Sequence, residues 1–166
     1  MDDLNRLIAC QQMFRHACAF SECSDMAKKR FKHETADIEW YITPATVNSA
    51  FVCEVYIKAL MKYYGVKTAK KHKLKELYEA LPEKAKEWIK ITVRNYYGGI
   101  WMNPFGFECL DNISDAFEQW RYSYEHDWNE SCTMNIDLGF LMAFRNALRE
   151  ACSQLFFGKT WEEYIK

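Results

Sequence analysis

Glycine and proline are scarce in this sequence, which has only six Gly and three Pro among 166 residues. A β-sandwich or a β-barrel needs a turn about every 8–12 residues, and turns depend heavily on Gly, Pro, Asn and Asp. The scarcity of these residues therefore favours long helices. The sequence also contains no internal repeat, low-complexity tract or linker. We expect one helical domain over residues 1–166.

A large net charge and a long apolar run are both absent. The formal net charge is −1, which disfavours binding to nucleic acid through bulk charge and leaves only a local basic patch. Charged residues interrupt the apolar stretches well before membrane-spanning length. Residues 1–20 include Asp2, Asp3 and Arg6, a pattern that does not match a signal peptide. We expect a cytoplasmic protein without a membrane segment.

The cysteines form no C-x-x-C pair, and their number, seven, is odd. A disulfide framework is therefore not indicated, and the simplest interpretation is reduced thiols in the cytoplasm. No cysteine stands directly beside a histidine in the sequence, so a nucleophilic cysteine is not expected. The cysteines are Cys10, Cys18, Cys23, Cys53, Cys109, Cys132 and Cys152.

Apolar residues recur at helical spacing through most of the chain, and no segment alternates like a strand. We expect helices over Asp2 to about Phe31, Thr43–Tyr64, Lys71–Leu81, Pro82 to about Tyr96, Asn112 to about Glu125 and Ile136–Phe157, then a short helix opened by the capping box Thr160–Glu163. Thr43 and Asn112 would be N-caps, with Pro44 at the first helical position. Residues 98–106 and 127–135 read as loops. The fold class predicted is an all-α helical bundle with additional short helices.

The segment Thr43–Tyr64 is apolar almost all round, which is typical of a central helix in a bundle. A narrow polar line crosses it at multiples of four residues, through Thr46, Glu54, Lys58 and Lys62. Glu54 and Lys58 have the favourable i,i+4 orientation for an ion pair. Two interpretations follow: a solvated stripe with a salt bridge, or a charged pair held in a cleft, where Glu54 and Lys58 would bind a substrate.

Lysines gather between Lys58 and Lys75, where the sequence has seven Lys and no acidic residue. Such a run is either a solvated loop or a patch that contacts phosphate groups. In the second case Lys70, Lys71 and Lys73 would guide RNA. His72, within the run, would open a helix and cap it or pack against it.

Arg121 and His126 form an R-x4-H motif that pairs a permanent cation with a group that titrates near neutral pH. His126 can act as general acid or base on a ribose 2′-hydroxyl, and Arg121 can hold the phosphoryl oxygens, so the pair could cleave RNA without a metal. Five helical residues turn the chain about 140° away from the same face. The two side chains converge only if the helix ends near Glu125, or if they meet across two subunits. Otherwise Arg121 braces a helix end and His126 is an exposed loop residue.

His126 also stands near Asp127 and Glu130, but this spacing matches no defined metal site. We therefore expect neither a metal nor a cofactor.

Three segments resemble proteins of the HEPN family, of the kind found in prokaryotes. They are the E-x-x-x-K helix within Asn48–Met61, the H-x-L-x-x-L segment His72–Leu77, and the R-Y-x-Y-E segment that follows Trp120. The resemblance extends from about Thr43 to Phe157.

The resemblance implies an antiparallel helical bundle that forms a homodimer. It implies a metal-independent ribonuclease, acting as a toxin or phage-defence effector, whose R-x4–6-H motif corresponds to Arg121 and His126. Cleavage through the 2′-hydroxyl would leave a cyclic phosphate. A cognate antitoxin or a nucleotidyltransferase would be the protein partner.

The family also contains proteins without nuclease activity, which serve as binding or dimerisation modules. Family nucleases often have a polar Asn, Asp or His after the motif arginine, and this chain has Tyr122 there. The alternative hypothesis is therefore a non-catalytic module that binds a nucleotide or a partner protein through Glu54 and Lys58.

Overall fold

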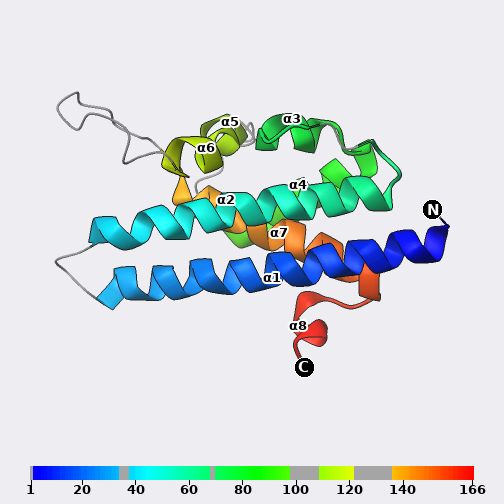
Figure 1. Cartoon of the computed structure of the whole chain (residues 1–166), viewed down its shortest axis with the longest axis horizontal. Coiled ribbons are helices and arrows are strands. Elements are labelled where there is room, and N and C mark those ends of the chain that lie inside the picture. Colours follow the sequence, from blue (N-terminus) through cyan, green and yellow to red (C-terminus); the bar gives the residue numbers. More distant parts are fainter. Residues whose placement is uncertain (1, 34–37, 68–69, 98–108, 122–135) are drawn as a thin grey trace.

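Two long helices form the front of the molecule. The computed structural model describes residues 2–33, 38–67, 70–97, 109–121 and 136–166. Helix α1 (Asp3–His33) runs along the whole length of the molecule, and α2 (Ile38–Tyr63) returns beside it in the opposite direction (Figure 1). These two helices pack against each other along their lengths. The predicted all-α class is confirmed, because the described residues are helical and contain no strand.

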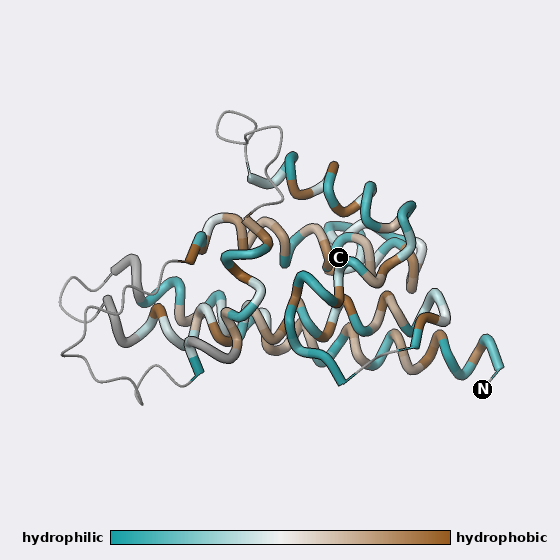
Figure 2. Tube along the Cα trace, turned by 90° about the horizontal axis from the view of Figure 1, so that it is seen from above, coloured by the Kyte–Doolittle hydropathy of each residue, from teal (hydrophilic) through white to brown (hydrophobic). Residues whose placement is uncertain are grey.

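The remaining helices cover the other sides of α2. Helix α7 (Leu138–Phe157) packs behind α1 and α2, and α4 (Glu83–Tyr97) packs against α7. A third group lies along α2 on the side away from α1: α3 (Leu74–Glu79), α5 (Cys109–Ser114) and α6 (Ala116–Arg121) (Figure 1). Figure 2 shows hydrophilic and hydrophobic residues alternating along α4, as expected of a helix packed on one side. No helix in the described ranges is both long and apolar enough to cross a bilayer.

Aromatic rings connect the helices in the core. Phe14 of α1 is fully buried, and its ring lies 5.8 Å from that of Tyr56 on α2 and 6.4 Å from that of Phe156 on α7, between centroids. It also contacts Tyr164 of the last short helix, α8 (Trp161–Tyr164), at 5.2 Å. The capping box predicted at Thr160 opens α8.

Two helix starts differ from the sequence prediction. Pro44 lies inside α2, which begins at Ile38, so Thr43 is not an N-cap. The missing proline N–H costs one backbone hydrogen bond, and Ile42, which packs against the core, compensates by burying apolar surface. Asn112 also lies inside a helix, because α5 begins at Cys109; a break at Asp115 then separates α5 from α6.

The carboxylate of Asp137 connects the end of α4 to the start of α7, on either side of the segment that contains α5 and α6. Asp137 caps α7, since its Oδ1 accepts a hydrogen bond from the backbone N–H of Phe140 at 2.8 Å. Its Oδ2 accepts a hydrogen bond from the Tyr97 hydroxyl at 2.5 Å. This hydrogen bond therefore joins the last residue of α4 to the N-cap residue of α7, so the two ends of the segment between these helices lie together. This hydrogen bond, more than burial, raises the pKa of Tyr97 to about 12.

Replacing Tyr97 by Phe should lower stability at neutral pH by about 1 kcal/mol, the typical contribution of a hydrogen bond. Because folding raises the pKa of Tyr97, its stabilising effect is complete below the unfolded value of about 10 and is lost as pH rises through about 12. Urea unfolding at a series of pH values should show the parent and Y97F converging at alkaline pH. A difference that stays constant to pH 12 would contradict the role of the hydroxyl proton.

Candidate functional site

Arg121 is an exposed residue at the described end of α6. Its guanidinium carbon lies 5.6 Å from the centroid of the Phe117 ring, one turn earlier in the same helix. Trp120, the residue before it, is buried in the core. The side chain of Arg121 therefore stands at the surface, while its neighbours fix α6 on α2.

The second half of the predicted R-x4-H motif lies outside the described residues. His126 belongs to the range 122–135, as do Tyr122, Asp127 and Glu130, so the structure reports only on Arg121. The convergence of Arg121 and His126 therefore stays a prediction.

Glu54 brings Lys58 and His72 together. Its Oε1 lies 2.6 Å from the Lys58 ammonium and 3.0 Å from Nδ1 of His72. Lys58 is the i+4 neighbour on α2, and His72 comes from the segment that leads into α3. The ion pair predicted from the i,i+4 spacing is present. His72 does not cap α3, whose N-cap is Lys73; instead it ties the lysine-rich segment to α2.

The polar line on α2 is not a solvated stripe. The side chain of Glu54 is only 7% exposed, and Thr46 is fully buried. The Oε2 atom of Glu54 is buried and has no hydrogen-bond partner among the residues that the structure describes. A buried carboxylate is stabilised only by such close donors, so Lys58 and His72 account for its placement.

Glu54 and Lys58 do not line the groove between α2, α4 and α7. This groove has a volume of about 320 Å³ and a mainly apolar lining, with Trp88 and Ile89 of α4 facing Leu155 of α7. Glu54 and Lys58 lie outside it, at the contact of α2 with the residues before α3. Any ligand of this pair must therefore approach along the surface beside α3.

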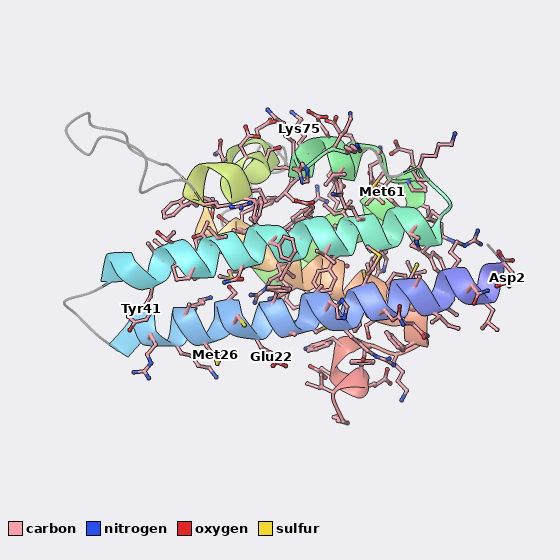
Figure 3. All side chains as sticks on the ribbon, viewed as in Figure 1. Asp2, Glu22, Met26, Tyr41, Met61 and Lys75 are labelled. Carbon is pink, nitrogen blue, oxygen red and sulfur yellow. The ribbon has the colours of Figure 1, made fainter. Side chains whose placement is uncertain are left out.

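The predicted RNA-guiding lysines are exposed, but carboxylates face two of them. Lys71 pairs with Glu76 at 2.9 Å, and Lys73 pairs with Asp115 at 3.4 Å. Lys70 is exposed and has no ion pair within the described ranges. Figure 3 places the next lysine, Lys75, at the outer edge of this layer, away from α1. The acidic partners are Glu76 of α3 and Asp115, which follows α5. Both lie outside the sequence segment Lys58–Lys75, so this segment alone does not reveal them. Exposed ion pairs of this kind contribute little and can give way to phosphate groups.

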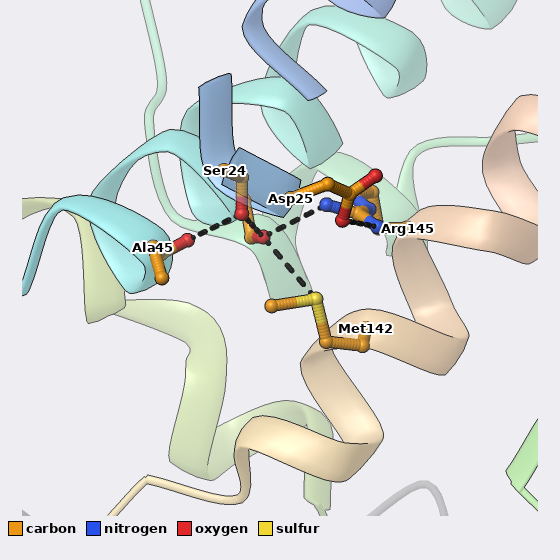
Figure 4. Close-up of polar contacts among 6 residues, drawn as sticks. Ser24, Asp25, Ala45, Met142 and Arg145 are labelled. Atoms are coloured by element: carbon orange, nitrogen blue, oxygen red, sulfur yellow. Dashed lines mark hydrogen bonds and ion pairs between the residues drawn. The ribbon is translucent and has the colours of Figure 1, made fainter. Parts of the chain in front are cut away.

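A buried arginine was not singled out by the sequence patterns. Arg145 of α7 has a side chain only 5% exposed, and its guanidinium lies 2.7 Å from Asp25 of α1. It also donates a hydrogen bond to Ser49 of α2, whose hydroxyl bonds that of Ser24 at 2.7 Å (Figure 4). Ser24 donates in turn to the carbonyl of Ala45. The network joins three helices at one point.

Two of the described thiols, Cys53 and Cys152, are fully buried. The cysteines in the described ranges are free. Burial raises the pKa of the Cys53 thiol to about 12, and it also raises the pKa of the Cys152 thiol well above its ordinary value. Such thiols stay protonated and inert. No cluster of three or more His, Cys, Asp or Glu side chains suited to a metal occurs in the described part of the chain.

Comparison with known protein families, with curated proteins and with solved structures finds no match to this chain. The class that the fold defines is an all-α helical bundle. Its candidate sites are the exposed Arg121 and the half-exposed His72, which contacts the buried carboxylate of Glu54.

Asp25→Ala should destabilise the fold by roughly 2–3 kcal/mol, because it leaves the buried Arg145 without its opposite charge. The partial exposure of Asp25 keeps the cost at this lower end. Asp3→Ala is the matched control, since Asp3 pairs with Arg6 at the same distance of 2.7 Å but is 91% exposed. The control should change stability by less than about 0.5 kcal/mol. Equal urea midpoints for the two variants would show that the buried pair is not important to folding.

Proposed function

We propose that the chain is a metal-independent endoribonuclease of the HEPN type, which acts in the cytoplasm as a toxin or phage-defence effector. The observation that carries the proposal is the position of Arg121. This permanent cation is exposed at the described end of α6, five residues before His126 in the sequence.

In the proposed reaction Arg121 holds the non-bridging oxygens of the scissile phosphate and offsets their developing charge. His126 is the general acid or base. The 2′ oxygen loses its proton and bonds to phosphorus, the bond from phosphorus to the 5′ oxygen breaks, and the 5′ oxygen takes up a proton. The products are a 2′,3′-cyclic phosphate and a 5′-hydroxyl.

The exposed lysines supply the attraction for the RNA backbone in this proposal. Lys70, Lys71 and Lys73 stand in one short segment, next to the turn that precedes α6. Their ion pairs with Glu76 and Asp115 lie at the surface and can exchange for phosphate. A homodimer would bring two Arg121 side chains to one RNA groove, and an antitoxin or a nucleotidyltransferase would be the regulating partner.

Arg121→Ala and His126→Ala should each abolish cleavage of total RNA in the presence of EDTA, a loss of at least about 100-fold. Arg121 is exposed, so the melting temperature of the Arg121→Ala variant should stay close to that of the parent. Arg94→Ala and His16→Ala are the matched controls, because both residues are exposed on other helices. Full activity in both motif variants would overturn the proposal.

A second candidate function is a binding module, favoured by the cluster of Glu54, Lys58 and His72. This cluster gathers one carboxylate and two donors from two separate segments of chain. Such a set can take the polar edge of a nucleotide or a charged side chain of a partner protein.

A thermal-shift screen against nucleotides tests this candidate. If the cluster binds a nucleotide, the parent should melt at a higher temperature with that nucleotide, and Glu54→Ala should lose the shift. Asp3→Ala is again the control, because it changes only an exposed carboxylate. Clear RNA cleavage together with no nucleotide shift would rule out the binding module in favour of the nuclease.

A further inference from the structure

The groove between α2, α4 and α7 has the size and the lining of a small-molecule site. Its volume is about 320 Å³, at the lower end of the range of about 300–1,000 Å³ for such sites. Leu60 of α2 and Ile89 of α4 line it and are fully buried, whereas Trp88 and Leu155 line it and are partly exposed. Apolar surface in the groove therefore keeps contact with water, and a ligand that removes this contact binds favourably.

Two small side chains keep the groove from being filled. Ala85 of α4 and Ala151 of α7 line it, and both are buried. Protein interiors are otherwise close-packed, with few voids larger than a water molecule. A longer aliphatic side chain at either position would occupy part of this volume. The space that the two alanines leave suits the apolar part of a ligand.

Lys84 is the one charged residue among the described residues that line the groove. It is exposed and, in the described part of the chain, makes no ion pair with either Glu83 or Glu87. Glu83 pairs instead with Lys86 at 2.5 Å. An apolar groove with an unpaired cation at its rim is complementary in charge to an anion.

The polar residues of the lining lie at one end of the groove. Helices α4 and α7 pack side by side and run antiparallel, because Tyr97 at the end of α4 binds Asp137 at the start of α7. The start of α4, with Lys84, therefore lies level with the end of α7, with Gln154. Tyr64, directly after α2, lines the same groove.

Two of these polar residues can donate hydrogen bonds to an anion. Burial raises the pKa of the Tyr64 hydroxyl above its ordinary value, so this group stays neutral and protonated. Gln154 uses one amide N–H for Glu150, at 2.8 Å, and an amide group has a second N–H. Farther along α4, Trp88 and Ile89 supply apolar lining. The groove is thus polar at one end and apolar beyond it, which matches an amphipathic ligand.

We propose that this groove binds a small carboxylate with an apolar body, which places its carboxylate at Lys84 and its body along Trp88. The site goes beyond the proposed ribonuclease and does not depend on it. A single lysine matches the single charge of a carboxylate, whereas a phosphate dianion would be only half neutralised. A protein partner would contact roughly 20–30 residues a side, far more than the nine described residues that line this groove.

Calorimetric titration with octanoate below its micelle concentration, and with 1-octanol as the uncharged ligand of the same chain length, tests the role of the charge. The parent should bind one octanoate per chain and bind 1-octanol more weakly. Lys84→Gln should weaken octanoate binding about two- to fivefold, the usual effect of an exposed ion pair, and leave 1-octanol binding unchanged. Lys29→Gln is the matched control, because Lys29 of α1 is also exposed and has no ion pair within the described ranges.

Quenching of tryptophan fluorescence by 8-bromooctanoate tests the location. Bromine quenches an indole that it contacts, so this ligand should quench the parent. Trp88→Phe keeps an aromatic wall but removes the indole, so it should still bind octanoate and lose most of the quenching. Trp161→Phe is the control and should keep the quenching, because Trp161 lies on α8, outside the groove.

Three results would overturn the site. They are a parent that does not bind octanoate, a Lys84→Gln variant with the parent's affinity for octanoate, and a Trp88→Phe variant that is quenched as fully as the parent. Urea midpoints close to that of the parent exclude unfolding as the cause of lost binding. None of these measurements depends on RNA cleavage, so failure of this site and failure of the proposed ribonuclease are separate results.

Discussion

Coverage of α2 on all sides is the constraint on which the rest of the structure depends. A helix that is apolar almost all round must lose contact with water along its whole length to contribute its full burial energy. Helix α1 covers one side, α7 a second, and α3 with α6 a third. Several polar residues of α2 are enclosed with the apolar ones, and two of them, Ser49 and Glu54, have polar partners outside α2. The charged clusters follow from this enclosure.

The polar clusters at Ser49 and at Glu54 on α2 differ in how far their partners are buried, and this difference determines whether each can contact a ligand. Ser49 meets Arg145 and Ser24 deep between three helices, where a charge serves only to hold them in register. Glu54 lies at the contact with the segment before α3, where its partner His72 is half exposed. The first cluster is thus structural, and the second can reach a ligand.

The sequence predicted the helices whose periodicity is strong and the ion pair at i,i+4, because both depend on neighbours in the chain. It missed the Asp25–Arg145 pair, whose members are 120 residues apart. It placed a helix start at Pro44, because propensity favours proline there, whereas α2 begins six residues earlier, at Ile38, and Ile42 packs against the core. The partners of Lys71 and Lys73 lie outside the run of lysines, so charge spacing alone suggested a more basic surface than the fold provides.

Identification of the RNA ends tests most directly whether the protein cleaves RNA by attack of the 2′ oxygen. A defined single-stranded RNA is incubated with the protein in EDTA, and the fragments are weighed by mass spectrometry. We predict fragments with a 2′,3′-cyclic phosphate at one end and a 5′-hydroxyl at the other, and no cleavage where the nucleotide before the bond is 2′-deoxy. Intact RNA, or fragments with 3′-hydroxyl and 5′-phosphate ends, would contradict attack by the 2′ oxygen and with it the chemistry proposed for Arg121 and His126.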